Sequence, residues 1–81
     1  MGILYNLMAK ISKDMLRKLV NENFFDNFKS IEEIVERLDQ KGFSISGKKI
    51  SLLSQLLTFL CREEALERKK DEGGRWEYKK V

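Results

Sequence analysis

The sequence predicts a mainly α-helical domain with a small C-terminal β-hairpin, an α+β fold. Three observations lead to this class. Apolar residues recur at spacings of three and four through most of residues 3–60, as they do on the buried face of amphipathic helices. Residues 65–81 change to a period of two, which is typical of strands. Gly73 and Gly74 interrupt that last stretch near its middle, where a hairpin would turn.

The chain length of 81 residues fits a single domain. A domain of this size buries only about 60% of its unfolded surface, so a simple fold or stabilisation by association is expected. Within residues 1–81 we expect an N-terminal helical extension at 1–12, a helical core at 13–64 and a hairpin at 65–81.

The composition is that of a folded, very soluble chain, with 42% hydrophobic and 36% charged residues. A single cysteine and the lack of a secretory signal predict a reducing, cytoplasmic location. Polar residues interrupt residues 1–11 well short of the roughly 20 apolar residues that a membrane span needs. We therefore expect no membrane association.

The net charge of +3 arises in the second half of the chain. Residues 1–43 carry seven basic and seven acidic side chains, whereas residues 44–81 carry nine basic and six acidic ones. This modest bias is compatible with a polyanionic partner. With no histidine, no cysteine pair and no glycine-rich phosphate loop, we expect no metal, cofactor, small-molecule ligand or enzymatic activity.

The first helical stretch runs from Ile3 to Val20 and contains a possible break. Ser12 can cap a helix that begins at Lys13, and the Asn-rich segment 21–23 would end it. Four apolar residues of that helix suffice for one core-facing stripe: Met15, Leu16, Leu19 and Val20.

Five large apolar side chains before or at the break are then surplus: Ile3, Leu4, Leu7, Met8 and Ile11. They are too many to leave in water on a small domain. They could fold back onto Leu52 and Phe59 of the same chain, or pair with the same residues of a second chain. We expect the second arrangement, a homodimer built mainly on residues 2–20.

Three phenylalanines follow within five residues, Phe24, Phe25 and Phe28. We expect this connecting segment to pack on the core and to include a helical turn. Aromatic clusters can also stack on single-stranded nucleic acid, but no basic residue separates the first two rings.

A capping box, Ser30-Ile31-Glu32-Glu33, opens the second core helix. Ile31, Ile34, Val35 and Leu38 continue it with helical spacing, and Gly42 supplies a stop. No strand is predicted between the first two core helices.

The third core helix is expected over Gly47–Arg62, with Ser46 as its N-cap. Its apolar residues cover more than half of the circumference and should be buried: Ile50, Leu52, Leu53, Leu56, Leu57, Phe59, Leu60 and Cys61. The remaining strip contains no acidic residue and consists of Lys48, Ser51, Ser54, Gln55, Thr58 and Arg62. Such groups read base edges and phosphates from a DNA major groove. Alternatively, this is a central core helix whose polar strip faces water.

The C-terminal hairpin is expected to turn through Asp71, Glu72 and Gly73, with Gly73 in the left-handed conformation. That loop pairs Arg68 with Trp76 and Leu66 with Tyr78, so that Leu66, Trp76 and Tyr78 face the core. It also opposes Glu67 to Glu77 and Lys69 to Arg75, which leaves other registers open.

The order of these elements resembles the winged helix-turn-helix superfamily of DNA-binding domains. The resemblance covers residues 13–81 and rests on Ser-Ile-Glu-Glu-Ile-Val at 30–35, the helix from Ile50 to Leu60, and Leu-Glu-Arg-Lys-Lys-Asp-Glu-Gly-Gly-Arg-Trp-Glu-Tyr at 66–78. It implies binding to double-stranded DNA, with the third helix in the major groove and the hairpin, or wing, beside the phosphate backbone. A small transcriptional regulator is the expected role.

On this reading, Ser51, Gln55 and Thr58 lie near base edges. The residues expected near phosphates are Lys48, Lys49, Arg62, Lys69, Lys70 and Arg75. A winged helix that docks onto other proteins is the alternative, because Leu52 and Phe59 lie close to the polar strip and acidic residues dilute the positive field around the hairpin.

Overall fold

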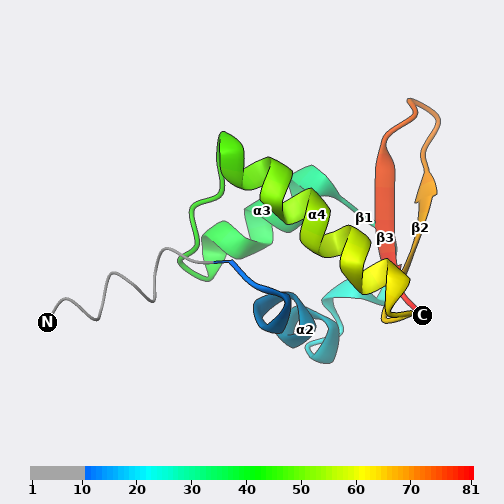
Figure 1. The fold of residues 1–81 in the computed structure, drawn as a ribbon, viewed down its shortest axis with the longest axis horizontal. Helices are drawn as coiled ribbons and strands as arrows, with labels where there is room; N and C mark the ends of the chain where they lie inside the picture. The colour runs from blue at the N-terminus through cyan, green and yellow to red at the C-terminus, as the bar shows by residue number, and fades with distance from the viewer. Residues whose placement is uncertain (1–10) are drawn as a thin grey trace, which may run out of the picture.

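The computed structural model describes residues 11–81, which form an α+β fold (Figure 1). The elements of this part of the chain are α2 (Lys13–Asn21), the 3₁₀ turn η1 (Phe24–Asp26), β1 (Lys29–Ser30), α3 (Ile31–Gln40), α4 (Lys48–Arg62), β2 (Leu66–Lys70) and β3 (Trp76–Lys80). The predicted α+β class is therefore confirmed. No helix among these residues is long and apolar enough to cross a membrane.

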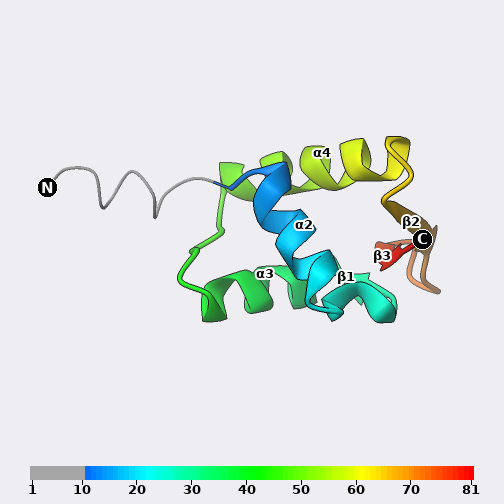
Figure 2. The ribbon, with the colours of Figure 1, turned by 90° about the horizontal axis from the view of Figure 1, so that it is seen from below.

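Helix α2 begins where its cap predicts. The Ser12 hydroxyl accepts a hydrogen bond from the Met15 backbone N–H at 3.3 Å, so it satisfies a donor that the first helical turn leaves free. Met15, Leu16 and Leu19 are buried. Seen from below, α2 runs between α4 on one side and α3 on the other (Figure 2), so its apolar stripe meets the centre of the molecule.

Helix α3 carries the predicted capping box. The Ser30 hydroxyl accepts from the Glu33 N–H at 3.1 Å, and the Glu33 carboxylate accepts from the Ser30 N–H at 2.9 Å. Ile34 and Leu38 are buried on its inner face. Gly42 follows the helix with φ of 95°, a conformation that costs glycine nothing, and it ends the helix as predicted.

The sheet has three strands instead of the hairpin alone. Its order is β1-β3-β2, and β1 pairs antiparallel with β3 through Lys29 opposite Tyr78 and Ser30 opposite Glu77. This strand was not predicted from the sequence. A strand of two residues is too short to show the alternating pattern that identifies strands in a sequence. Lys29 and Ser30 form a strand only because they pair with the neighbouring β3.

Helix α4 differs from expectation at its start. Gly47, with φ of 58° and no side-chain cap, occupies the N-cap position that was predicted for Ser46. The preceding loop approaches the helix in a left-handed conformation that glycine adopts without strain, so the chain uses glycine there in place of a hydroxyl cap.

The apolar surface of α4 is only partly buried, which corrects the prediction that all of it would be. Leu53, Leu57 and Leu60 are fully buried, but Ile50, Leu52 and Phe59 remain 40%, 41% and 46% exposed. The core touches one stripe of this long helix. The three exposed side chains lie at its first turn or outside that stripe.

The hairpin register is two residues away from the predicted one. Leu66 pairs with Lys80, where Tyr78 was predicted. Arg68 pairs with Tyr78, where Trp76 was predicted. A slip of two keeps every side chain on its predicted face. It also sets Glu67 opposite Lys79 and Lys69 opposite Glu77, so opposite charges replace the like-charge pairs of the predicted register.

The loop that sets this register has five residues, 71–75, and is organised by Asp71. One oxygen of its carboxylate accepts from the backbone N–H groups of Gly73 at 2.8 Å and Arg75 at 2.9 Å. Gly74, with φ of 83°, takes the left-handed position that was predicted for Gly73. The longer loop is favoured because the Asp71 side chain closes it.

The core joins all the helices to the sheet. Phe25 is fully buried with Phe24 against it edge-on, at a ring centroid distance of 5.0 Å, which confirms core packing and the helical turn. Ile11 is also buried in this core. It is therefore not a surplus residue, because its own chain already covers it. Ile3, Leu4, Leu7 and Met8 lie outside the described residues.

Candidate nucleic-acid interface

The two predicted DNA-contacting elements meet at one corner and diverge from it. Helix α4 ends at Arg62, and β2 begins at Leu66, so residues 63–65 form the corner (Figure 1). Glu64 turns there with φ of 64°, and the Ala65 N–H donates to the Leu60 carbonyl at 2.9 Å. The corner therefore holds the helix and the hairpin at a defined angle.

A groove of about 410 Å³ lies between these elements. Ser54 and Thr58 line it from α4, and Arg68, Trp76 and Tyr78 line it from the hairpin. Ile31 and Glu32 at the start of α3 and Gly74 and Arg75 of the hairpin loop complete it. We call this space the helix–hairpin groove. It combines aromatic, cationic and hydroxyl groups.

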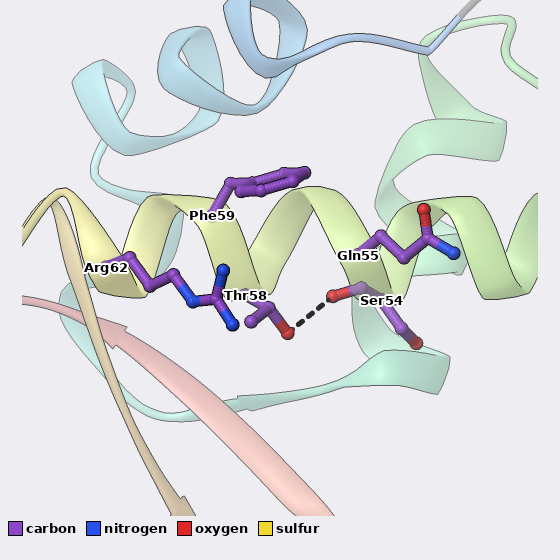
Figure 3. A pocket seen from close by; sticks show the side chains of 5 residues that line it. All are labelled: Ser54, Gln55, Thr58, Phe59 and Arg62. Carbon is purple, nitrogen blue, oxygen red and sulfur yellow. Dashed lines mark hydrogen bonds between the residues drawn. The ribbon is translucent and has the colours of Figure 1, made fainter.

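The outward face of α4 carries the predicted base-reading residues. Ser51, Gln55 and Arg62 are exposed, and Arg62 extends back along the helix beside Thr58, as Figure 3 shows. Phe59 points from the same region toward α2, where the Lys13 ammonium lies 6.0 Å from its ring centroid. A shallow depression of about 280 Å³ lies over this face.

Thr58 is less available than Ser51 or Gln55. Its hydroxyl donates to the Ser54 carbonyl of the same helix at 2.9 Å (Figure 3), and its side chain is half-buried. The hydroxyl can then only accept a hydrogen bond from a ligand. Two of the three residues predicted near base edges thus keep their full hydrogen-bonding capacity, and the third keeps part of it.

The predicted phosphate-contacting residues do not all gather in one place. Lys48 and Lys49 are exposed at the start of α4, and Arg62 lies at its end, roughly 20 Å away by helical rise. Lys70 lies on the groove side of the hairpin, whereas Lys69 lies on the opposite face because successive strand residues alternate. Lys69 is therefore separated from the others.

Lys69 belongs instead to a second aromatic cluster. Its ammonium lies 4.4 Å from the Phe28 ring centroid, and that of Lys79 lies 5.6 Å from the same centroid. Cross-strand Glu67 and Glu77 share this sheet face. The acidic residues make this face less attractive to a polyanion than the groove side.

Trp76 and Arg68 belong to this candidate site but were not among the residues predicted from the sequence. Trp76 was predicted to face the core, but it is 37% exposed at the groove edge. The Arg68 guanidinium carbon lies 4.1 Å and the Lys70 ammonium 5.1 Å from its ring centroid. Exposed contacts of this kind contribute about 0.5–1 kcal/mol. The alternation of Arg68 and Lys70 on one strand face, opposite an aromatic residue, is the sequence signal for this cluster.

Salt bridges engage some of the surface cations and leave others without a carboxylate partner. In residues 11–81, carboxylates lie within 4 Å of five cations: Lys13 and Arg17 (Glu63), Arg37 and Lys41 (Glu22), and Arg75 (Glu32 and Asp71), with Arg37 at 3.9 Å. Among these described residues, Arg62, Arg68 and Lys70 have no such partner. Their charges are consequently free to meet an anion.

The carboxylates that do form pairs hold their charge firmly. The hydrogen bond from Lys13 lowers the pKa of Glu63, and the hydrogen bond from Lys41 lowers that of Glu22, in each case against a smaller opposing effect of burial. Lys13 lies 2.6 Å from Glu63, and Lys41 lies 2.9 Å from Glu22. These pairs engage cations of α2 and of the end of α3, whereas Arg62, Arg68 and Lys70 have no carboxylate partner among residues 11–81.

Two titratable groups near the groove have shifted pKa values. Burial raises the pKa of the Cys61 thiol and that of the Tyr78 hydroxyl, which keeps both protonated near neutral pH. Within residues 11–81 no cluster of His, Cys, Asp or Glu is placed to hold a metal ion.

Comparison of the chain with protein-family models, with curated proteins and with solved structures finds no match. The residues of the α4 face and the helix–hairpin groove therefore carry the functional proposal.

Proposed function

We propose that this chain is a winged helix-turn-helix domain that binds duplex DNA. Helix α4 would enter the major groove, and the β2–β3 hairpin would act as a wing beside the phosphate backbone. The element order supports this assignment, because β1 stands between the first and second core helices and joins the hairpin in one sheet. A small transcriptional regulator without catalytic activity is the role that we propose.

One observation carries the proposal. The exposed face of α4 has short hydrogen-bonding groups and no acidic residue, and the adjoining cations Arg62, Arg68 and Lys70 have no carboxylate partner among residues 11–81. Base edges need hydrogen-bonding side chains, and phosphates need free cations. The two requirements are met side by side on one surface.

Titration of labelled duplex DNA of mixed sequence at low salt, followed by gel shift or fluorescence anisotropy, tests the proposal. We expect binding at tens of micromolar protein or below, since non-specific dissociation constants are typically about 10⁻⁴–10⁻⁶ M even at physiological salt. A protein that binds no duplex under these conditions would not be a DNA-binding domain.

Charge-removing variants should separate the groove side from the opposite sheet face. Arg62→Ala and Lys70→Ala should each weaken binding to all sequences and reduce the slope of log K against log salt concentration by about 1. Lys69→Ala, which removes the same charge from the other face, is the matched control and should change the slope less. Equal effects of Lys69→Ala and Lys70→Ala would contradict a groove-side contact.

The sequence preference should depend on the exposed amide of α4. Gln55→Ala should relax discrimination at one base pair by about 1–3 kcal/mol if the amide reads a base edge. Binding of randomised duplexes followed by sequencing measures this preference. An unchanged sequence preference in Gln55→Ala would show that Gln55 does not contact a base edge.

Docking onto another protein is the second candidate function, and the exposure of Leu52 and Phe59 on α4 favours it. Pull-down from a native lysate discriminates between the candidates. Recovery of nucleic acid alone, released by nuclease or salt, supports DNA binding. Recovery of a protein that is lost with Leu52→Ser and Phe59→Ser, but not with Gln55→Ala, supports docking.

A further inference from the structure

We propose that the helix–hairpin groove receives an unpaired nucleobase, which stacks on Trp76. This inference rests on the proposed DNA binding and specifies the substrate class. The preferred ligand would be duplex DNA with an adjoining single-stranded segment. The duplex would lie on the outward face of α4, and the unpaired base would enter the groove beside it.

The position of Trp76 is the first step. Trp76 and Tyr78 lie on the same face of β3, yet Trp76 is 37% exposed and Tyr78 only 2%. The Tyr78 ring thus belongs to the core, while the indole reaches the groove edge. An exposed aromatic ring offers a base a stacking surface, which bases accept without regard to sequence.

The remaining groove residues match the other parts of a nucleotide. Ser54 and Glu32 can hydrogen-bond a base edge, and Arg68 carries an unpaired charge that can meet a phosphate. The volume of about 410 Å³ falls in the range of small-molecule sites. By contrast, the groove between α3 and the following loop adds Glu36 and Asp39 to Glu32 and is lined by no cation among the described residues, so it would repel a polyanion.

The cations over the indole do not prevent stacking. Arg68 and Lys70 lie within cation–π distance of the ring in the absence of nucleic acid. Base stacking on an aromatic residue is stronger than a single exposed cation–π contact, and the two displaced cations gain new partners, so an entering base can displace them. The displaced cations would then be next to the phosphates that flank the base.

An unpaired base is required because duplex bases are already stacked on both faces. Extruding one from a duplex costs unpairing and unstacking energy, whereas a base in a single strand costs least. The groove should therefore add affinity for a single-stranded segment and none for a blunt duplex.

Fluorescence anisotropy with three labelled DNAs tests the proposal. They are a blunt duplex, the same duplex with an overhang of about ten thymidines, and the same duplex with an abasic overhang of equal length. The abasic strand keeps the phosphates and removes the bases. We expect the thymidine overhang to bind roughly 5- to 150-fold more tightly than the abasic one.

Variants of Trp76 test whether its indole ring causes the tighter binding of the thymidine overhang. Trp76→Ala should abolish the difference between the two overhangs, and Trp76→Phe should keep most of it. Phe28→Ala, which removes the aromatic ring of the opposite sheet face, is the matched control and should leave the difference intact. Circular dichroism of each variant checks the fold. Because the chain has one tryptophan, its emission in the unaltered protein is an independent readout and should be quenched by the thymidine overhang only.

The outcomes separate the inference from the proposed function. Equal affinity for both overhangs, or an unchanged difference in Trp76→Ala, would overturn the stacking site while blunt-duplex binding still supports DNA binding. Loss of the difference in Phe28→Ala alone would assign stacking to the other sheet face and overturn the groove site. Failure to bind any of the three DNAs would overturn both proposals.

Discussion

Leu52 and Leu53 are neighbours in the sequence with opposite environments. Leu53 is fully buried, whereas Leu52 is 41% exposed on the outer side of α4. Leu53→Ala should lower the free energy of unfolding by about 2–5 kcal/mol because it leaves a cavity in the core. Leu52→Ala, the matched control, should change it by only about 0.5 kcal/mol. Urea denaturation followed by circular dichroism measures the free energy of unfolding of both variants. Similar losses of stability in the two variants would contradict the finding that Leu53 is buried and Leu52 is exposed.

Trp76 and Tyr78 show how exposure divides residues of similar chemistry. Both are aromatic and share one face of β3, but Tyr78 lies opposite Arg68 near the middle of the sheet, and Trp76 lies at the loop end opposite Lys70. The core covers Tyr78 and ends before Trp76. The surface near α4 thus gains an aromatic ring that the core does not need.

At the scale of single elements, α3 is stabilised by its own cap. Ser30→Ala removes the hydroxyl that accepts from Glu33, so it should lower the free energy of unfolding by about 0.5–2 kcal/mol. Ser46→Ala is the matched control, since Gly47 and not Ser46 caps α4, and it should have little effect. Thermal and urea unfolding of both variants tests the pair. A larger loss of stability in Ser46→Ala than in Ser30→Ala would contradict this assignment of the caps.

The hairpin loop should make stability sensitive to acid through Asp71. Hydrogen bonds from the backbone N–H groups, Arg75 first, lower the pKa of this carboxyl below its ordinary value of 3.8, with burial opposing them. A lowered pKa stabilises the folded state above pH 3.8, and that contribution is lost as the pH falls through the folded-state pKa.

Asp71→Ala should therefore be less stable than the unaltered protein at pH 7, and the difference should shrink as the pH drops below about 3.8. Urea denaturation at a series of pH values measures the difference. Glu72→Ala removes a neighbouring exposed carboxylate from the same loop and serves as the control. A difference that stays constant down to pH 2 would show that the Asp71 charge does not stabilise the loop.

For the whole molecule, the predicted homodimer would depend on residues before the described core. Ile11 is buried by its own chain, which leaves Ile3, Leu4, Leu7 and Met8 as the residues proposed for a homodimer. Sedimentation equilibrium at tens of micromolar should give a species of twice 9.6 kDa, and Leu4→Glu with Leu7→Glu should abolish it. Leu52→Glu, on the exposed face of α4, controls for adding a charge elsewhere. A single species at 9.6 kDa would reject the dimer.

A dimer would also affect DNA recognition. Two copies of α4 related by a two-fold axis could reach half-sites one helical turn apart, which raises affinity without new contacts in either subunit. Affinity for a palindromic site should then fall in the Leu4→Glu/Leu7→Glu protein. The salt dependence of its non-specific DNA binding, counted per subunit, should stay the same.

The sequence by itself determined the features that depend on near neighbours along the chain. Ser12 and the Ser30–Glu33 capping box predicted the starts of α2 and α3, because a cap bonds backbone groups within three residues. Apolar spacing predicted that α4 is a helix, and alternation predicted the two hairpin strands and which face each residue would take.

Tertiary structure decided what depends on distant partners. Strand β1 exists only because β3 lies beside Lys29 and Ser30, and the hairpin register depends on cross-strand charge pairs and on the Asp71 loop. The core covers only one stripe of α4, so periodicity alone could not tell the buried Leu53 from the exposed Leu52 and Phe59. The groove around Trp76 likewise forms where two elements diverge from one corner, and local pattern carries no information about that angle.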